Sequence, residues 1–287
     1  MRQDGRRSGN VEDRRGAKAA AGGAVGIGGV LVAIVYVMLG GDPNDAVQIA
    51  TAVSSAGGGA SEPAAAPAGD DAQAQLVSVV LADTEDVWTA IFASAGKRYQ
   101  EPKLVLFTDS VQSACGRAGA SIGPFYCPAD QKAYIDLSFY DQLRRRFGAP
   151  GDFAQAYVIA HEIGHHVQNL LGVSGQVDQA GRGRSEAEVN ALSVRQELQA
   201  DCFAGVWAHH ADKQRHLLEA GDVEEALRAA EAIGDDTLQR KAQGTVVPES
   251  FTHGTSAMRQ KWLMAGMKSG SIADCDTFGA NAAAVGL

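Results

Sequence analysis

The stretch AYVIAHEIGHHVQNLLG, residues 156–172, places three histidines and a glutamate within six residues of an otherwise apolar run. It contains no proline and only one glycine before its end, and its apolar residues recur at helical spacing. At 100° per residue these apolar side chains line one side of a helix. His161 and His165, four residues apart, share the opposite side, one turn from each other. The stretch therefore predicts a helix with one packed face and one face that carries histidines.

This spacing is the HExxH pattern. Two imidazoles one turn apart can reach the same zinc ion, and Glu162 can reach a water on that ion rather than the ion itself. His166 points about 140° away from His161, toward the apolar flank, so we interpret it as a packing or hydrogen-bonding side chain. The alternative is a solvated amphipathic helix whose polar face holds histidines by chance. A third ligand on another part of the chain is needed to decide.

A second predicted helix offers that ligand. Zinc hydrolases use three protein ligands and keep a fourth position open for water. The continuation HExxHxxGxxH is absent, but Ser185 and Glu188 form a capping box that predicts the start of a helix beyond a glycine-rich loop. Glu197 and Asp201 lie four residues apart on one face of it. We predict that Glu197 is the third ligand and that Asp201 accepts a hydrogen bond from a ligand histidine. A surface carboxylate is the alternative for Glu197.

His253 is the candidate for stabilising the oxyanion of a hydrolytic reaction. It stands in ESFTHGTSAMRQKW, residues 249–262, in a polar turn just before a predicted helix. An ordinary surface histidine is the alternative. Upstream of the HExxH helix, KAYIDLS (residues 132–138) alternates apolar and polar side chains, which predicts a strand.

The N-terminal region has the pattern of a membrane anchor. Residues 19–41 carry no charge, and about 20 apolar residues suffice for a helix to cross a bilayer. Residues 1–18 hold six basic and three acidic side chains, and basic flanks stay cytoplasmic. We therefore predict a cytoplasmic tail over 1–18, a transmembrane anchor over 19–41, and a catalytic domain on the exported side. A cleaved signal peptide is the alternative.

The rest of the chain divides into a linker and one domain. Residues 42–75 are rich in glycine, alanine and proline, which predicts a flexible linker. Helical spacing begins near residue 76, so we expect one domain over 76–278 and a short tail over 279–287. The net charge of −9 excludes nucleic acid as an expected partner, because phosphate binding needs a basic surface.

Four cysteines, at positions 115, 127, 202 and 275, all follow the apolar run. An even number in an exported domain predicts disulfides, for which three pairings are possible. Cys115 and Cys127 flank a glycine-rich turn, so a local bridge is the simplest pairing and leaves Cys202 with Cys275. The absence of a CxxC pair disfavours zinc binding by these thiols. Buried free thiols are the remaining alternative.

Three segments, AYVIAHEIGHHVQ, QELQADCFAGVWAHH and CGRAGASIGPFYCPADQKAYIDLSFYDQL, resemble the bacterial neutral zinc metallopeptidase family. Its members are membrane-anchored proteins with an exported zincin-like domain. The resemblance covers most of residues 75–278 and extends to the apolar N-terminal run. It implies an α+β fold that is mainly helical with a small β-sheet. It also implies that the strand over 132–138 lies at the edge of that sheet and pairs with an extended substrate.

The expected function is a zinc-dependent endopeptidase anchored in a membrane. One Zn²⁺ per chain is held by His161, His165 and Glu197, and Glu162 is the general base. The expected partners are a peptide or protein substrate and the lipid bilayer, and the sequence makes no prediction of oligomeric state. Two alternatives stay open. One is a catalytically silent zincin-fold scaffold of the cell envelope, and the other is a membrane-tethered interaction protein without metal.

Overall fold

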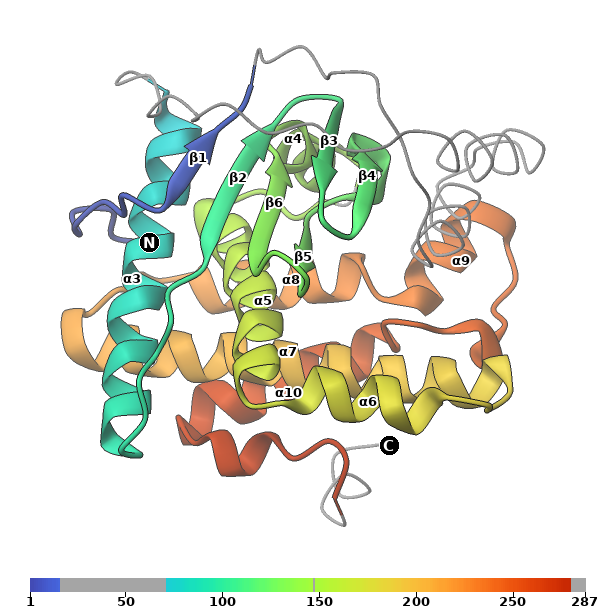
Figure 1. Ribbon diagram of the computed structural model, residues 1–287. Coiled ribbons are helices and arrows are strands. Elements are labelled where there is room, and N and C mark those ends of the chain that lie inside the picture. The colour runs from blue at the N-terminus through green and yellow to red at the C-terminus, as the bar shows by residue number, and fades with distance from the viewer. Residues whose placement is uncertain (16–70, 147, 280–287) are drawn as a thin grey trace.

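The structure is a computed structural model that describes residues 1–15, 71–146 and 148–279 (Figure 1). Its strands are β1 (Val11–Asp13), β2 (Lys103–Phe107), β3 (Ser110–Ser113), β4 (Gly116–Gly119), β5 (Phe125–Cys127) and β6 (Lys132–Asp136). Its helices are α3 (Ala72–Ser94), α4 (Ser138–Arg145), α5 (Asp152–Leu170), α6 (Val173–Gly181), α7 (Glu186–Arg215), α8 (Asp222–Ala232), α9 (Asp235–Gln243) and α10 (Ser256–Ser269), with short 3₁₀ turns η1 (Ala120–Ile122), η2 (Pro248–Ser250) and η3 (Ile272–Cys275). The described chain is mainly helical with small sheets, which confirms the α+β fold class.

Helices α5 and α7 form the centre of the domain. The sheet lies on one side of α5, and α10 packs along α7 (Figure 1). The apolar stripe of α5 is fully buried at Ile159, Ile163 and Val167, as its spacing predicts. The predicted capping box is present at the start of α7, where the Ser185 side chain and the Glu188 side chain each accept a hydrogen bond from the other's backbone N–H.

The two helices lie close together at a glycine. A Cβ atom on Gly164 would lie only 2.9 Å from the backbone oxygen of Ala200 on α7. Real side chains do not fit at that distance without movement of the neighbouring backbone, so the missing side chain allows the close approach. Because Gly164 lies between His161 and His165, the approach brings both histidines beside the middle of α7.

The main sheet has the strand order β1-β2-β6-β5, with β1, β2 and β6 parallel and β5 antiparallel to β6. The strand expected at the sheet edge over 132–138 is β6, which lies between β2 and β5, so that expectation is wrong. Between β5 and β6 the chain reverses direction in a turn. There Asp130 accepts hydrogen bonds from the Lys132 backbone and the Tyr134 hydroxyl. Alternating side chains identify a strand, but they do not distinguish an interior strand from an edge strand. The edge strand of the sheet on this side is β5, which pairs with β6.

The first fifteen residues belong to this domain and are not a separate tail, contrary to the expectation for residues 1–18. Strand β1 pairs with Leu104–Leu106 of β2, and Val11 joins the hydrophobic core. Glu85 of α3 is only 1% exposed, and its carboxylate accepts hydrogen bonds from Arg6 (2.7 Å), Ser8 (2.5 Å) and Asn10 (2.8 Å). Sequence reasoning missed this docking because it depends on partners about 75 or more residues away.

The predicted anchor over 19–41 lies outside the described residues, as do most of the predicted linker and residues 280–287. Helix α3 begins at Ala72, with the Asp71 side chain accepting hydrogen bonds from the first turn, so this helix starts slightly before residue 76. Of the helices that the structure describes, none is both long and apolar enough to cross a membrane.

Both predicted disulfides are present. Cys115 pairs with Cys127, with the two Cα atoms 5.8 Å apart, and Cys202 pairs with Cys275 at 5.6 Å. The first joins the turn between β3 and β4 to the edge strand β5. The second joins α7 to η3, so it fixes the C-terminal segment to the helix that carries Glu197.

Candidate metal centre

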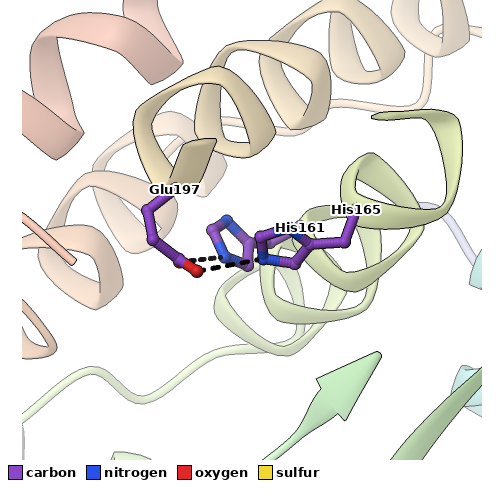
Figure 2. A group of neighbouring side chains, drawn as sticks. All are labelled: His161, His165 and Glu197. Carbon is purple, nitrogen blue, oxygen red and sulfur yellow. Dashed lines mark hydrogen bonds and ion pairs between the residues drawn. The ribbon is translucent and has the colours of Figure 1, made fainter. Parts of the chain in front are cut away.

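His161 and His165 from α5 and Glu197 from α7 point toward one another (Figure 2). The Nε2 atom of His161 lies 3.1 Å from Oε2 of Glu197, and Nε2 of His165 lies 3.4 Å from Oε1. The three possible donor atoms all lie within 4.8 Å of one another. The structure thus brings together the three residues that the sequence analysis names as ligands.

The donor set fits zinc. Imidazole nitrogens and carboxylate oxygens bind Zn²⁺ at about 2.0–2.2 Å in tetrahedral sites, which places neighbouring donor atoms roughly 3.3–3.6 Å apart. The nitrogen–oxygen distances of 3.1 and 3.4 Å are close to that spacing. All three side chains are largely buried, and charged or polar donors that converge in such a site favour a cation.

A buried ionic network holds His161. Asp201, which is fully buried, accepts a hydrogen bond from Nδ1 of His161 at 2.8 Å, as the sequence analysis predicts. It also accepts hydrogen bonds from the Tyr157 hydroxyl at 2.6 Å and from Nε of Arg259 at 2.8 Å. Because a carboxylate only accepts, Nδ1 carries the proton and Nε2 of His161 faces Glu197.

The electrostatics of this network favour positive charge at His161. Burial disfavours ionisation of Asp201, but Arg259 and His161 outweigh burial and lower the pKa of Asp201 to about 2. Burial also disfavours the imidazolium of His161, yet Asp201 and Glu197 raise its pKa to about 10. The carboxylates that favour positive charge here would also favour a cation, which has to displace the proton from the same nitrogen.

His165 is held by a neutral partner. Its Nδ1 atom lies 2.9 Å from the amide oxygen of Gln168, one turn further along α5. Gln168 is fully buried and reaches α7 through its amide nitrogen. The two histidines are thus oriented by different chemistry, His161 by a charged carboxylate and His165 by an amide.

Glu162 lies at a cleft of about 810 Å³ that also reaches His161, His165 and Glu197. Within the described part of the chain, no group hydrogen-bonds its carboxylate. Burial raises its pKa, which is a property of carboxylates that act as bases near neutral pH. The position fits a group that acts on a reactant in the cleft rather than one that supports the fold.

His253 lines the same cleft. Asp235, the first residue of α9, is 1% exposed and organises the loop before α10 by accepting hydrogen bonds from the backbone N–H groups of Thr252, His253 and Gly254. The Nδ1 atom of His253 lies 3.2 Å from the same carboxylate. Burial lowers the pKa of His253, but Asp235 and Glu197 outweigh burial and raise it.

His166 lies away from the centre, on the flank that helical geometry predicts. It is fully buried, with Nε2 at 2.6 Å from the backbone oxygen of Gln100 and Nδ1 at 2.9 Å from the Tyr126 hydroxyl. Burial lowers its pKa to about 4, so it is neutral at physiological pH. It connects the histidine helix to the edge strand β5.

Sequence reasoning missed four residues of the site: Tyr157, Gln168, Asp235 and Arg259. Tyr157 could have been found, because it precedes His161 by one helical turn and shares its side of α5. Gln168 follows His165 by three residues and could have been found in the same way. Arg259 and Asp235 come from other helices, and no spacing in the sequence connects them to the histidines.

A comparison with protein families identifies a match over most of the chain. Residues 1–278 match the family model described as putative neutral zinc metallopeptidase. The chain belongs to this family. Because the match begins at residue 1, it includes the N-terminal segment that forms β1. Membership implies zinc as the metal of the centre described above.

Among curated relatives, the protein YpfJ of Escherichia coli K12 is 50% identical over 298 residues, which is 97% of this chain and 99% of that protein. Rv2575 of Mycobacterium tuberculosis H37Rv is 46% identical over 192 residues, 63% of this chain and 64% of that protein. Both carry the name "uncharacterized protein". No solved structure matches the chain.

Proposed function

We propose that this protein is a zinc-dependent endopeptidase that binds one Zn²⁺ through His161, His165 and Glu197. The observation that carries the proposal is an ionisable glutamate, Glu162, at the cleft beside that donor set, without a structural partner in the described chain. A purely structural metal site has no need of such a base. Zinc, when bound, lowers the pKa of a water toward 7 and polarises the carbonyl of the scissile bond.

The residues of the chain divide the remaining work. Glu162 takes the proton of the attacking water and passes it to the leaving amine. His253, whose Nδ1 faces Asp235, directs its other nitrogen away from that carboxylate and donates a hydrogen bond to the carbonyl oxygen as negative charge develops there. Asp201 and Gln168 keep the ligand imidazoles in the tautomer that presents Nε2.

The substrate is proposed to be an extended peptide segment that binds along β5. No other strand of the described sheet pairs with the outer edge of β5, and Phe125 and Tyr126 line the cleft. A free edge offers backbone N–H and C=O groups to an extended chain. This assignment replaces the strand over 132–138, whose two edges are both occupied.

The test is zinc content together with cleavage of an unfolded protein such as reduced casein, with and without a chelator. We expect Glu162→Gln to retain one zinc per chain and to lose activity by about 10²–10⁴-fold, because general base catalysis typically contributes that much. The matched control is Glu224→Gln, the same substitution at an exposed position of α8, which should leave both zinc and activity unchanged.

Three outcomes decide the proposal. Loss of zinc from Glu162→Gln would show that this carboxylate serves the ion and not the water. Full activity of the variant would remove it from the reaction. A wild-type protein that binds zinc and cleaves no unfolded substrate would favour the silent scaffold instead.

We also propose that residues 1–15 and the domain lie in the same compartment, on the exported side. The contacts of Arg6, Ser8 and Asn10 with buried Glu85 support a shared compartment, because removal of these partners would leave a buried charge unpaired. The two disulfides support an oxidising compartment. A single membrane span over residues 19–41 would place residues 1–15 and the domain on opposite sides, so this proposal and the predicted single-span anchor exclude each other.

Single added cysteines test this placement, because the four native cysteines are paired and do not react. Gly9→Cys and Gly175→Cys both place a thiol at an exposed position with open space around it. In intact cells, a membrane-impermeant maleimide should label both. Labelling of Gly175→Cys alone would separate the N-terminal segment from the domain. Labelling of neither before lysis, and of both after it, would place the whole domain in the cytoplasm.

A further inference from the structure

Two buried glutamines connect His165 to a disulfide on the far side of α7. Gln168 is fully buried, and its amide nitrogen donates to the backbone oxygen of Gln196 at 2.7 Å and to the side-chain oxygen of Gln199 at 3.1 Å. Both of those atoms only accept hydrogen bonds, so the amide nitrogen must face them. The amide oxygen of Gln168 therefore faces His165, from which it accepts at 2.9 Å.

The orientation of Gln168 fixes the protonation of His165. Because the amide oxygen cannot donate, Nδ1 of His165 must carry the proton, and the lone pair of Nε2 is left to face Glu197. Rotation of the Gln168 amide by 180° would place a donor against His165 and an oxygen against the two acceptors. The fold excludes that alternative through the interactions on α7, not through His165 itself.

Gln199 extends this connection to the C-terminal segment. Its side-chain oxygen accepts from Gln168, so its nitrogen faces the other way and donates to the backbone oxygen of Cys275 at 3.0 Å. Cys275 is fully buried and bonded to Cys202, which follows Asp201 on α7. The disulfide thus holds the carbonyl that orients Gln199.

We infer that Gln168 and Gln199 are positioning residues that keep Nε2 of His165 available to the metal, and that the Cys202–Cys275 disulfide contributes to metal affinity through them. The inference rests on the proposed metal centre, but not on peptidase activity. It makes the C-terminal segment, which is remote from the cleft, a part of the metal site's support. A second contact, from the Thr277 hydroxyl to the backbone oxygen of Arg195 at 2.7 Å, also holds this segment, so loss of the disulfide should weaken the connection without abolishing it.

The test is zinc affinity, measured by competition with a chromophoric chelator, in variants that replace glutamine by methionine of similar volume. We expect Gln168→Met to weaken zinc binding about 10–100-fold, since loss of a hydrogen bond to a ligand histidine typically has that effect. Gln199→Met should have a smaller effect. The matched control is Gln239→Met, because Gln239 is also fully buried and hydrogen-bonded but serves the turn after α9. It should lower thermal stability and leave zinc affinity unchanged.

A double-mutant cycle tests the role of the disulfide. Replacement of Cys202 and Cys275 by alanine should weaken zinc binding in the wild-type background, and much less so in the Gln199→Met background, because the connection is already broken there. Equal losses in both backgrounds would overturn the route through Gln199. Normal zinc affinity in folded Gln168→Met would overturn the positioning role.

Imidazole ¹⁵N shifts of the intact protein give a measurement that needs no variant. We expect His165 to carry a proton on Nδ1 in the zinc-loaded protein, with Nε2 bound to the metal. A metal-bound Nδ1, or a proton on Nε2, would overturn the inference even if Gln168→Met does not fold. Absence of peptidase activity, with these affinities and shifts as expected, would contradict only the proposed function.

Discussion

Helix α5, which carries the histidines, and the N-terminal segment over residues 1–15 both place polar side chains in the interior of the same domain. These side chains serve different purposes in the two regions. On α5 the polar groups of His161 and His165 converge with Glu197, and Glu162 lines the cleft beside them. In the N-terminal segment the polar groups converge on a carboxylate that already belongs to the fold, Glu85, and satisfy it. The first region gathers polar groups that face a cleft, whereas the second supplies hydrogen bonds to a buried carboxylate.

The difference shows where charge serves binding and where it serves stability. A buried polar group that faces a cleft without a hydrogen-bond partner is a candidate for function. A buried polar group whose hydrogen bonds are all satisfied is part of the scaffold. Substitutions in the two regions should therefore change different measurements. The largest expected effect is the loss of zinc from a variant on α7, and the smallest is a pH-dependent change in the stability of a variant on β1.

The largest effect is expected at the third ligand. Glu197→Ala should lose zinc on dialysis, because two imidazoles alone leave the ion with too few protein ligands. His166→Ala should keep close to one zinc per folded chain, since His166 faces Tyr126 and Gln100. Metal analysis of the dialysed proteins checks both. Loss of zinc from His166→Ala together with retention in Glu197→Ala would make His166, and not Glu197, the third ligand.

A smaller effect on the same centre is expected at Asp201. Asp201→Asn keeps the shape of the side chain but removes the charge that holds His161 and Arg259. Zinc affinity should fall about 10–100-fold, the usual range for loss of such a partner. Chelator competition gives the value. An unchanged affinity would mean that Tyr157 and Arg259 orient His161 without the carboxylate.

The N-terminal segment should respond in stability and not in metal binding. Arg6→Ala removes the ion pair with buried Glu85 and should lower the free energy of unfolding by about 2 kcal/mol, the order expected for a hydrogen bond to a charged group. Arg7→Ala is the matched control, because Arg7 makes an exposed hydrogen bond to Gln75. Urea unfolding measures both. A zinc affinity altered by Arg6→Ala in the folded state would break the distinction between the two regions.

The smallest effect depends on pH. Burial disfavours the charged form of Glu12, but hydrogen bonds from Lys132 and Arg14 outweigh burial and lower its pKa from 4.5 to about 2. Glu12 therefore stabilises the fold above pH 4.5, and its contribution falls as the pH drops toward 2. The stability difference between wild type and Glu12→Gln should shrink when urea unfolding is repeated from pH 5 to pH 3. A constant difference would exclude this ion pair as its source.

Local patterns predicted most of the centre. The HExxH spacing located His161, Glu162 and His165 on one helix, and the capping box located the helix with Glu197 and Asp201. These features depend on residues within one or two turns of each other. Arg259 and Asp235 reach the site from other helices, so only tertiary packing connects them to it.

The docking of the N-terminal segment onto the domain was missed for the same reason. Its basic residues follow the pattern of a cytoplasmic flank, and the pattern contains nothing about Glu85 or the edge of β2. Strand β1 is only three residues long, too short for alternation to identify it. The interior position of β6 was missed because pairing on both sides of a strand is a property of its neighbours.

The close approach of α5 and α7 at Gly164 sets the spacing of the donor atoms in the candidate metal centre. Glu197 stands on one helix and both imidazoles on the other, so the gap between the helices sets how far apart the donor atoms lie. A methyl group on Gly164 would meet the backbone of Ala200 at 2.9 Å and would force α7 outward. The distance between the Glu197 carboxylate and the two imidazoles would increase with it. The spacing of the donor atoms therefore depends on a missing side chain as well as on the three that carry them.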